Sequence, residues 1–290
     1  MSGRPRTIQI FLPSGDPRGI RVGELTTSII RVVEVPRALL DDFLVMPEAK
    51  QVGLYFLVGD DEEADFPSVY VGQTGGCGQR LVEHHKKKEF WSRALVVVSM
   101  TNNLTQTHGL YLEWLSIKEA NQAGRYKSEN GNAGSKPHTP APLEADCQDI
   151  FDTVRTLIAT LGQPVFEPLV KQKDDGAQTE HFYMRSSTYD ATGQYTEEGL
   201  VVLKGSRARK EVNPSMVKHK GGSRRDALIA EGALVLEGSH YVFQKDVRFK
   251  TPSGASDTVA GASTNGWTTW KSKDGKTLDE LKRAQPVQAG

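Results

Sequence analysis

The chain has 290 residues, of which 36 are basic and 36 acidic, so its formal net charge is zero, and 37% of its residues are hydrophobic. This composition is typical of an ordinary globular protein and argues against one that coats nucleic acid through overall basicity. No apolar run approaches the roughly 20 residues of a membrane span, and none follows the basic start as in a signal peptide, so we expect a cytoplasmic protein with no membrane partner.

Residues 1–49 predict an N-terminal β-hairpin followed by a helix. Residues 7–12 and 27–35 are rich in strand-forming side chains and flank a segment that contains Gly and Pro. Residues 37–45 have helical spacing directly after Pro36, which suits the first position of a helix.

Residues 50–162 predict an α+β domain in which a small antiparallel three-stranded sheet is flanked by helices. The expected strands are 53–59, 69–72 and 94–100, and the expected helices are 79–91, 105–123 and 144–161. The polar segment 163–179 is expected to be a linker. Residues 180–290 are expected to form a small accessory α/β domain with a hairpin, a basic loop over 204–225, and a helix over 224–232.

Two tyrosines of the first domain are candidates for chemistry. If the strands at 53–59 and 69–72 pair antiparallel, Tyr55 and Tyr70 can project from one face while their aliphatic neighbours fill the core. Either tyrosine taken alone is an ordinary strand residue.

The following helices add charged groups. Arg80 and His84 are four residues apart and therefore share a helical face, where arginine suits a phosphate and histidine suits proton transfer. Glu113 lies in an otherwise apolar stripe, and a half-buried carboxylate usually has a partner. That partner is either an arginine or a divalent cation such as Mg²⁺.

One constellation gathers these residues in order along the chain. It comprises GLY at 53–55, YVG at 70–72, Arg80 with His84, Glu113, and an asparagine at Asn130 or Asn132. Over residues 50–135 this pattern resembles the GIY-YIG nucleases, and the segment QRLVEHHKKKEFW resembles their bacterial subgroup. Over roughly 180–283, segments such as NGWTTWKSKDGKTL resemble a small domain of unknown function that often follows GIY-YIG domains in bacteria.

The resemblance implies a metal-dependent endonuclease that hydrolyses phosphodiester bonds in DNA with one metal ion. Glu113 would hold Mg²⁺, or Mn²⁺ in its place, and Tyr70 with Tyr55 would orient or deprotonate the attacking water. Arg80 would stabilise charge on the phosphoryl oxygens, His84 would assist proton transfer, and Asn130 would complete the catalytic set. Because an ordinary tyrosine is a weak base at neutral pH, this mechanism requires a cation that lowers the tyrosine pKa. We expect Tyr55, Tyr70, Arg80, His84 and Glu113 to converge in one surface cleft.

Two basic segments are candidates for contact with nucleic acid. Lys86, Lys87 and Lys88 lie beside the expected site, and Arg207, Arg209 and Lys210 belong to a C-terminal basic stretch that runs on to Arg224 and Arg225. Both segments are equally compatible with solvated surface. Trp267 and Trp270 are expected to close the core of the small domain rather than to stack on bases. RNA stays an alternative substrate.

The alternative function is a catalytically inactive module that binds nucleic acid, or that binds a protein partner through the C-terminal domain.

Overall fold

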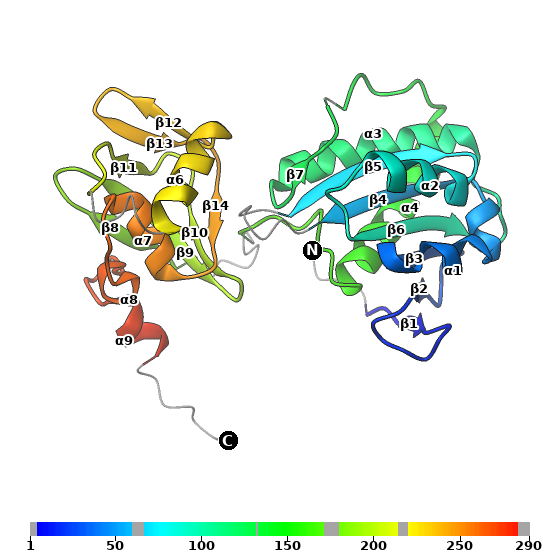
Figure 1. The fold of residues 1–290 in the computed structure, drawn as a ribbon, viewed down its shortest axis with the longest axis horizontal. Helices are drawn as coiled ribbons and strands as arrows, with labels where there is room; N and C mark the ends of the chain where they lie inside the picture. The colour runs from blue at the N-terminus through cyan, green and yellow to red at the C-terminus, as the bar shows by residue number, and fades with distance from the viewer. Residues whose placement is uncertain (1–4, 60–66, 132, 171–179, 214–219, 284–290) are drawn as a thin grey trace. The chain divides into compact units, whose positions relative to one another are not determined.

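The computed structural model describes residues 5–59, 67–131, 133–170, 180–213 and 220–283 (Figure 1). The chain divides into two compact units, Met1–Pro168 and Leu169–Gly290. The boundary falls within the segment 163–179 that was expected to be a linker, and residues 171–179 of that segment lie outside the described part of the chain. Both units combine helices with β-sheet, which confirms the α+β class expected for the first domain.

The first unit contains a seven-stranded sheet in the order β1-β2-β3-β6-β4-β5-β7. Its strands are β1 (Ile8–Phe11), β2 (Arg21–Leu25), β3 (Ile30–Pro36), β4 (Gly53–Gly59), β5 (Ser68–Thr74), β6 (Arg93–Ser99) and β7 (Lys127–Ser128). Neighbouring strands pair antiparallel, except that β7 pairs parallel with β5.

This sheet is larger than the expected three strands. The three strands predicted for the first domain, β4, β5 and β6, are adjacent and antiparallel, but β3 pairs with β6 and adds the N-terminal strands to the same sheet. The N-terminal hairpin also differs, since β1 pairs with β2, a strand that was not predicted. Gly23 and Glu24 interrupt the apolar pattern of β2, and the Leu161 side chain packs over Gly23.

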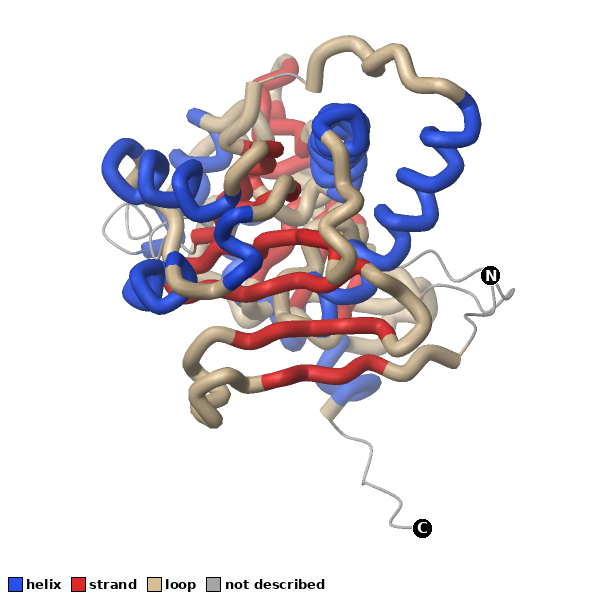
Figure 2. Tube along the Cα trace, turned by 90° about the vertical axis from the view of Figure 1, so that its right-hand side faces the viewer, coloured by secondary structure: helices blue, strands red, loops and turns tan. Residues whose placement is uncertain are grey.

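Helices cover both faces of this sheet, as the side view in Figure 2 shows. One face carries the 3₁₀ turns η1 (Arg37–Leu39) and η2 (Pro47–Lys50) with helices α1 (Leu40–Leu44) and α2 (Cys77–Lys87). The other face carries α3 (Gln106–Ala123) and α4 (Ala141–Thr160).

Alternation along the strands divides the side chains between two cores. Leu54 and Phe56 pack toward α3 and α4, whereas Tyr55 and Leu57 belong to the core under α2. The central strand β4 is buried along its whole length.

The second unit is also built on an antiparallel sheet. Its strands are β8 (Phe182–Arg185), β9 (Asp190–Thr196), β10 (Gly199–Val202), β11 (Arg207–Arg209), β12 (Leu234–Glu237), β13 (His240–Phe243) and β14 (Val247–Phe249). They follow the order β12-β13-β11-β9-β10-β14, and β8 pairs with β9. The described strand pairs are antiparallel, which replaces the expected α/β module by an α+β unit.

The described helices of the second unit are α6 (Lys220–Ala230), α7 (Pro252–Ala260), α8 (Gly266–Thr269) and α9 (Leu278–Lys282). Trp270 is fully buried and donates its indole N–H to the Pro252 carbonyl at 3.2 Å, which confirms its expected core position. Trp267 is half-buried. Its ring centroid lies 5.5 Å from that of Tyr195, and the Arg283 guanidinium carbon lies 3.6 Å from the centre of the Trp267 ring. Within the described residues, none of the helices combines the length and the apolar character that crossing a bilayer requires.

Candidate active site

The register of β4 against β5 places both candidate tyrosines on the face covered by α2. Tyr55 lies opposite Gly72 and Leu57 lies opposite Tyr70, so the two tyrosines are diagonal neighbours. Their ring centroids are 6.3 Å apart. Tyr55 is buried, with 1% of its surface exposed, and Tyr70 is half-buried.

Gly72 makes room for the buried tyrosine. A Cβ atom on residue 72 would lie 2.2 Å from the Tyr55 hydroxyl oxygen and 2.5 Å from the Cζ atom, closer than real Cβ atoms approach other atoms. The ring of Tyr55 therefore occupies the volume that a side chain at position 72 would need.

Helix α2 brings Arg80 and His84 to this ring. The Arg80 Nε–H donates to the Tyr55 hydroxyl oxygen at 3.2 Å, and the same oxygen lies 2.8 Å from His84 Nε2. The His84 ring is also 5.2 Å from the ring of Tyr70. Four residues from two strands and one helix thus form one contacting cluster.

Burial keeps the central pair of this cluster neutral. It raises the pKa of Tyr55, although the hydrogen bond from Arg80 acts in the opposite direction. Burial, with Arg80 and Lys88 nearby, lowers the pKa of His84 to about 4. Arg80 can only donate, so it takes one lone pair of the Tyr55 oxygen, and the same hydroxyl shares a second hydrogen bond with His84 Nε2. Arg80 alone therefore does not supply the lowered tyrosine pKa that the implied mechanism requires of this residue.

Arg80 has a second partner that the sequence analysis missed. Its Nη1 atom forms an ion pair with Glu83 Oε2 at 2.6 Å, and both side chains are partly exposed. The spacing of three residues on a helix is the signal that could have revealed this pair. The two residues also line a pocket of ≈ 430 Å³ formed with Gln79 and the loop between β5 and α2.

Glu113 lies on α3, on the face of the sheet opposite to α2. Helix α3 packs against β5 where Gly109 lies close to the side chain of Gln73. Burial raises the pKa of Glu113, while a hydrogen bond from the Gln73 backbone and the charge of Arg80 act in the opposite direction. The Glu113 charge also raises the pKa of Tyr55, so the two groups are electrostatically coupled. Among the described residues, no lysine or arginine forms an ion pair with Glu113.

Asn130 lies at the outer edge of β5. Its Oδ1 atom accepts from the Val71 N–H at 2.8 Å, and its Nδ2 atom donates to the Val71 carbonyl at 2.7 Å. Strand β7 pairs with β5 only at Ser68 and Val69, and Asn130 provides the next hydrogen-bonding partner along this edge of β5. Asn130 thus supports the strand between Tyr70 and Gly72, and its amide is engaged by backbone. Asn132 lies outside the described residues.

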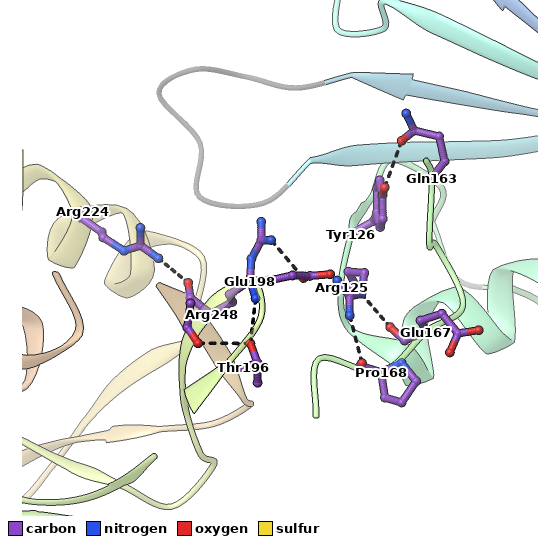
Figure 3. Close-up of polar contacts among 10 residues, drawn as sticks. Arg125, Tyr126, Gln163, Glu167, Pro168, Thr196, Glu198, Arg224 and Arg248 are labelled. Atoms are coloured by element: carbon purple, nitrogen blue, oxygen red, sulfur yellow. Dashed lines mark hydrogen bonds and ion pairs between the residues drawn. The ribbon is translucent and has the colours of Figure 1, made fainter. Parts of the chain in front are cut away.

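The segment before Asn130 is anchored within the first unit (Figure 3). The Tyr126 hydroxyl donates to Gln163 Oε1 at 3.0 Å. Arg125 donates to the carbonyls of Glu167 and Pro168 at 2.8 and 3.1 Å. These bonds fix the course of the chain between α3 and Asn130.

The expected nucleic-acid contacts fall into two groups. Lys86 and Lys87 are exposed at the end of α2, whereas the Lys88 ammonium lies 4.3 Å from the centre of the Tyr70 ring and belongs to the cluster. In the second unit, Arg207, Arg209 and Lys210 are exposed or half-buried around β11.

The expected extension of the basic stretch is wrong at Arg225, which is buried. Arg225 is 1% exposed and donates to the carbonyl of Thr258 at 2.7 Å. Arg224 donates to the carbonyl of Arg248 at 2.6 Å, as Figure 3 shows. Both guanidinium groups satisfy backbone carbonyls inside the second unit, because helix α6 turns them toward its sheet rather than to solvent.

No group of three or more His, Cys, Asp or Glu side chains gathers in a metal-binding arrangement in the part of the chain that the structure describes. Residues 182–282, which lie within the second unit, match the family described as Domain of unknown function (DUF4357). No curated protein and no solved structure matches the chain.

Proposed function

We propose that the first unit is a metal-dependent endonuclease of the GIY-YIG type that hydrolyses phosphodiester bonds in DNA, with RNA as the alternative substrate. The observation that carries the proposal is the contact network of Arg80, Tyr55 and His84, with Tyr70 against His84 and Glu113 coupled to Tyr55. A buried neutral pair beside a fixed cation and a carboxylate is an arrangement suited to proton transfer at a phosphate. The order of the five residues along the chain also supports it.

The character of Glu113 fits a divalent cation. It is a half-buried carboxylate whose pKa burial raises, and no basic side chain among the described residues pairs with it. Mg²⁺ and Mn²⁺ prefer such oxygen ligands, and Mg²⁺ keeps most of its waters, so one carboxylate can suffice. When bound, the metal would make a bound water more acidic and neutralise charge on the phosphate.

The chain's own residues would divide the remaining work. Arg80 donates from Nε to Tyr55 and from Nη1 to Glu83. Its Nη2 atom would therefore be the nitrogen that donates to a phosphoryl oxygen. Tyr70 is half-buried and would orient the attacking water. His84 Nε2 lies 2.8 Å from the Tyr55 hydroxyl, so the neutral imidazole would hold this hydroxyl in place beside Arg80.

A cleavage assay on one conservative variant tests this function. Full-length protein is incubated with supercoiled, single-stranded and branched DNA with and without Mg²⁺, and nicking is measured. Glu113→Gln should reduce cleavage by several orders of magnitude and leave DNA affinity and melting temperature unchanged, since it removes only the metal-binding charge. Glu119→Gln, an exchange on the same helix, is the matched control and should cleave normally.

Full activity in correctly folded Glu113→Gln protein would refute the assignment. A lowered melting temperature with undiminished activity per folded molecule would make Glu113 a structural residue. Tight DNA binding without metal-dependent nicking in the unaltered protein would instead favour the inactive binding module.

A further inference from the structure

Arginines that are distant in sequence share one face of the sheet in the second unit. Arg185 of β8 and Arg207 of β11 both lie opposite Asp190 of β9, so the three side chains form one row across the strands. Arg209 lies two residues beyond Arg207 and therefore on the same face. The opposite face belongs to the core, where Met184 and Ala208 are buried.

A pocket continues this row. It has a volume of ≈ 500 Å³, and Tyr183, Arg185, Lys271 and Lys273 are among the residues that line it. Tyr183 shares the face of Arg185 and exchanges backbone hydrogen bonds with Lys271 at 2.7 and 3.0 Å. Row and pocket together form a surface that we call the basic face, defined by Arg185, Arg207, Arg209, Lys271 and Lys273.

The cations of the basic face outweigh the acids near them. Arg185 pairs with Asp190 at 3.3 Å, but both side chains are more than 60% exposed, and solvent screens such pairs strongly. Arg209 and Glu211 approach only to 3.9 Å. Lys271 and Lys273 are exposed and form no ion pair within the described residues, and no acidic residue lines the pocket.

Two further groups suit a phosphate-bearing ligand with a flat base. The Arg185 guanidinium lies 4.7 Å from the centre of the Tyr183 ring, which joins a cation to an aromatic surface. Ser272 also lines the pocket, and its buried hydroxyl has no hydrogen-bond partner among the described residues. A positive groove beside an aromatic ring is the combination with which proteins hold single-stranded nucleic acid.

We propose that the basic face binds a single strand of DNA through several phosphates at once, with the pocket at Tyr183 taking one nucleotide. The extent of the face favours a strand over a free nucleotide, because Arg207 and Arg209 lie outside the pocket lining. This inference gives the second unit a ligand and does not depend on catalysis by the first.

The test measures DNA binding without cleavage. Full-length protein carrying Glu113→Gln is titrated, in EDTA, into a fluorescent 20-residue DNA strand over a series of salt concentrations. Adding Lys271→Ala with Lys273→Ala should weaken binding about 10-fold and reduce the salt slope by about 1.4, since each phosphate contact on a single strand contributes about 0.7. The matched control, Lys50→Ala with Lys250→Ala, removes two exposed lysines outside the basic face and outside both basic segments, and should change the Kd less than about two-fold.

Equal affinities and salt slopes in the two double variants, with equal melting temperatures, would overturn the inference. Thymidine monophosphate tests whether the face prefers a strand to a free nucleotide. If this nucleotide bound as tightly as the DNA strand, the inference would also be overturned. If the unaltered protein did not cleave DNA but the two double variants still differed in affinity, the result would count against the proposed nuclease. It would still support DNA binding by the basic face.

Discussion

Tyr55 is a polar side chain in a fully buried position, and the protein meets this cost with two hydrogen-bonding neighbours on one helix. Arg80 donates to its oxygen, and His84 Nε2 forms a second hydrogen bond with the same hydroxyl. An unpaired hydroxyl in this position would cost about 1–3 kcal/mol, so the network stabilises the fold as well as orienting the site.

Gly72→Ala should disrupt the hydrogen bonds of Tyr55 with Arg80 and His84. The new Cβ would overlap the Tyr55 hydroxyl and force the ring away from His84, at a cost of about 1–3 kcal/mol for overpacking in a dense core. Urea unfolding should show the loss, and cleavage per folded molecule should fall with it. Gly75→Ala is the matched control, since a Cβ there meets no atom within 4 Å. Equal stability in the two variants would contradict the close packing of Tyr55 on Gly72.

His84 should make stability depend on pH. Its folded pKa of about 4 lies below the ordinary value of 6.5, so the unfolded chain binds the proton more readily between these values. The contribution of His84 to the free energy of unfolding should therefore be complete above pH 6.5. It should fall by up to about 3 kcal/mol as the pH falls to 4. Urea titrations across this window measure the slope.

His84→Gln should remove this part of the slope. Tyr55→Phe should retain it, because burial is the largest cause of the shift. A slope that survives His84→Gln unchanged would assign the pH dependence to other groups.

The sequence predicted these residues because their spacing is local. Tyr55 and Tyr70 follow strand alternation, and Arg80 with His84 follows the helical turn. The sequence could not reveal that burial would be the largest influence on the Tyr55 pKa, because burial depends on how α2 packs against the sheet. Glu83 was not predicted although its spacing of three residues from Arg80 is visible, because ion pairs at this spacing are common on helix surfaces and do not by themselves mark a site.

Among the elements, β5 is the strand on which the site depends. Its outer edge is covered by β7 only at one end, and Asn130 then satisfies both backbone groups of Val71. A side-chain amide that mimics a strand in this way holds Tyr70 and Gly72, the residues on either side of Val71, in register.

Asn130→Ala should therefore act on the strand rather than on the chemistry. Losing both hydrogen bonds should lower the free energy of unfolding by about 1–3 kcal/mol, because two backbone groups of β5 lose their partners. Hydrogen exchange at the Val71 amide should accelerate. Asn130→Asp keeps the acceptor for the Val71 N–H and should protect that amide better than alanine does. Abolished cleavage with unchanged stability and exchange would instead place Asn130 in the catalytic set.

Elements with strong periodicity were predicted well, and those that depend on distant partners were not. Strands β4 and β6 and helices α3 and α4 lie within a few residues of their expected bounds. Strand β2 was missed because its pairing with β1 and β3, rather than its own pattern, makes it a strand. Helix α7 was missed because its small residues carry little amphipathic signal, although Thr251 caps it and Pro252 begins it.

For the whole molecule, zero net charge conceals local charge. The basic face joins Arg185 to Arg207 only because β8 and β11 both pair with β9, so no window of the sequence contains it. Arg207 and Lys210 of the predicted basic stretch are exposed and Arg209 is half-buried, whereas Arg225 is buried in the core of the second unit. Basic residues that cluster in the sequence therefore need not share one exposed surface when the cluster spans both strands and a buried helix.

The two-unit organisation predicts that residues 1–168 fold and cleave alone. Both hydrophobic cores of the first unit lie entirely within these residues, and Arg125 ties the chain at Glu167 and Pro168. The fragment should unfold in one cooperative transition and keep Mg²⁺-dependent nicking that Glu113→Gln abolishes. Its KM for single-stranded DNA should rise and depend less on salt, because it lacks the five cations of the basic face, each worth about 0.7 in salt slope. A folded fragment with the same KM and salt dependence as the full chain would show that the second unit does not hold the substrate.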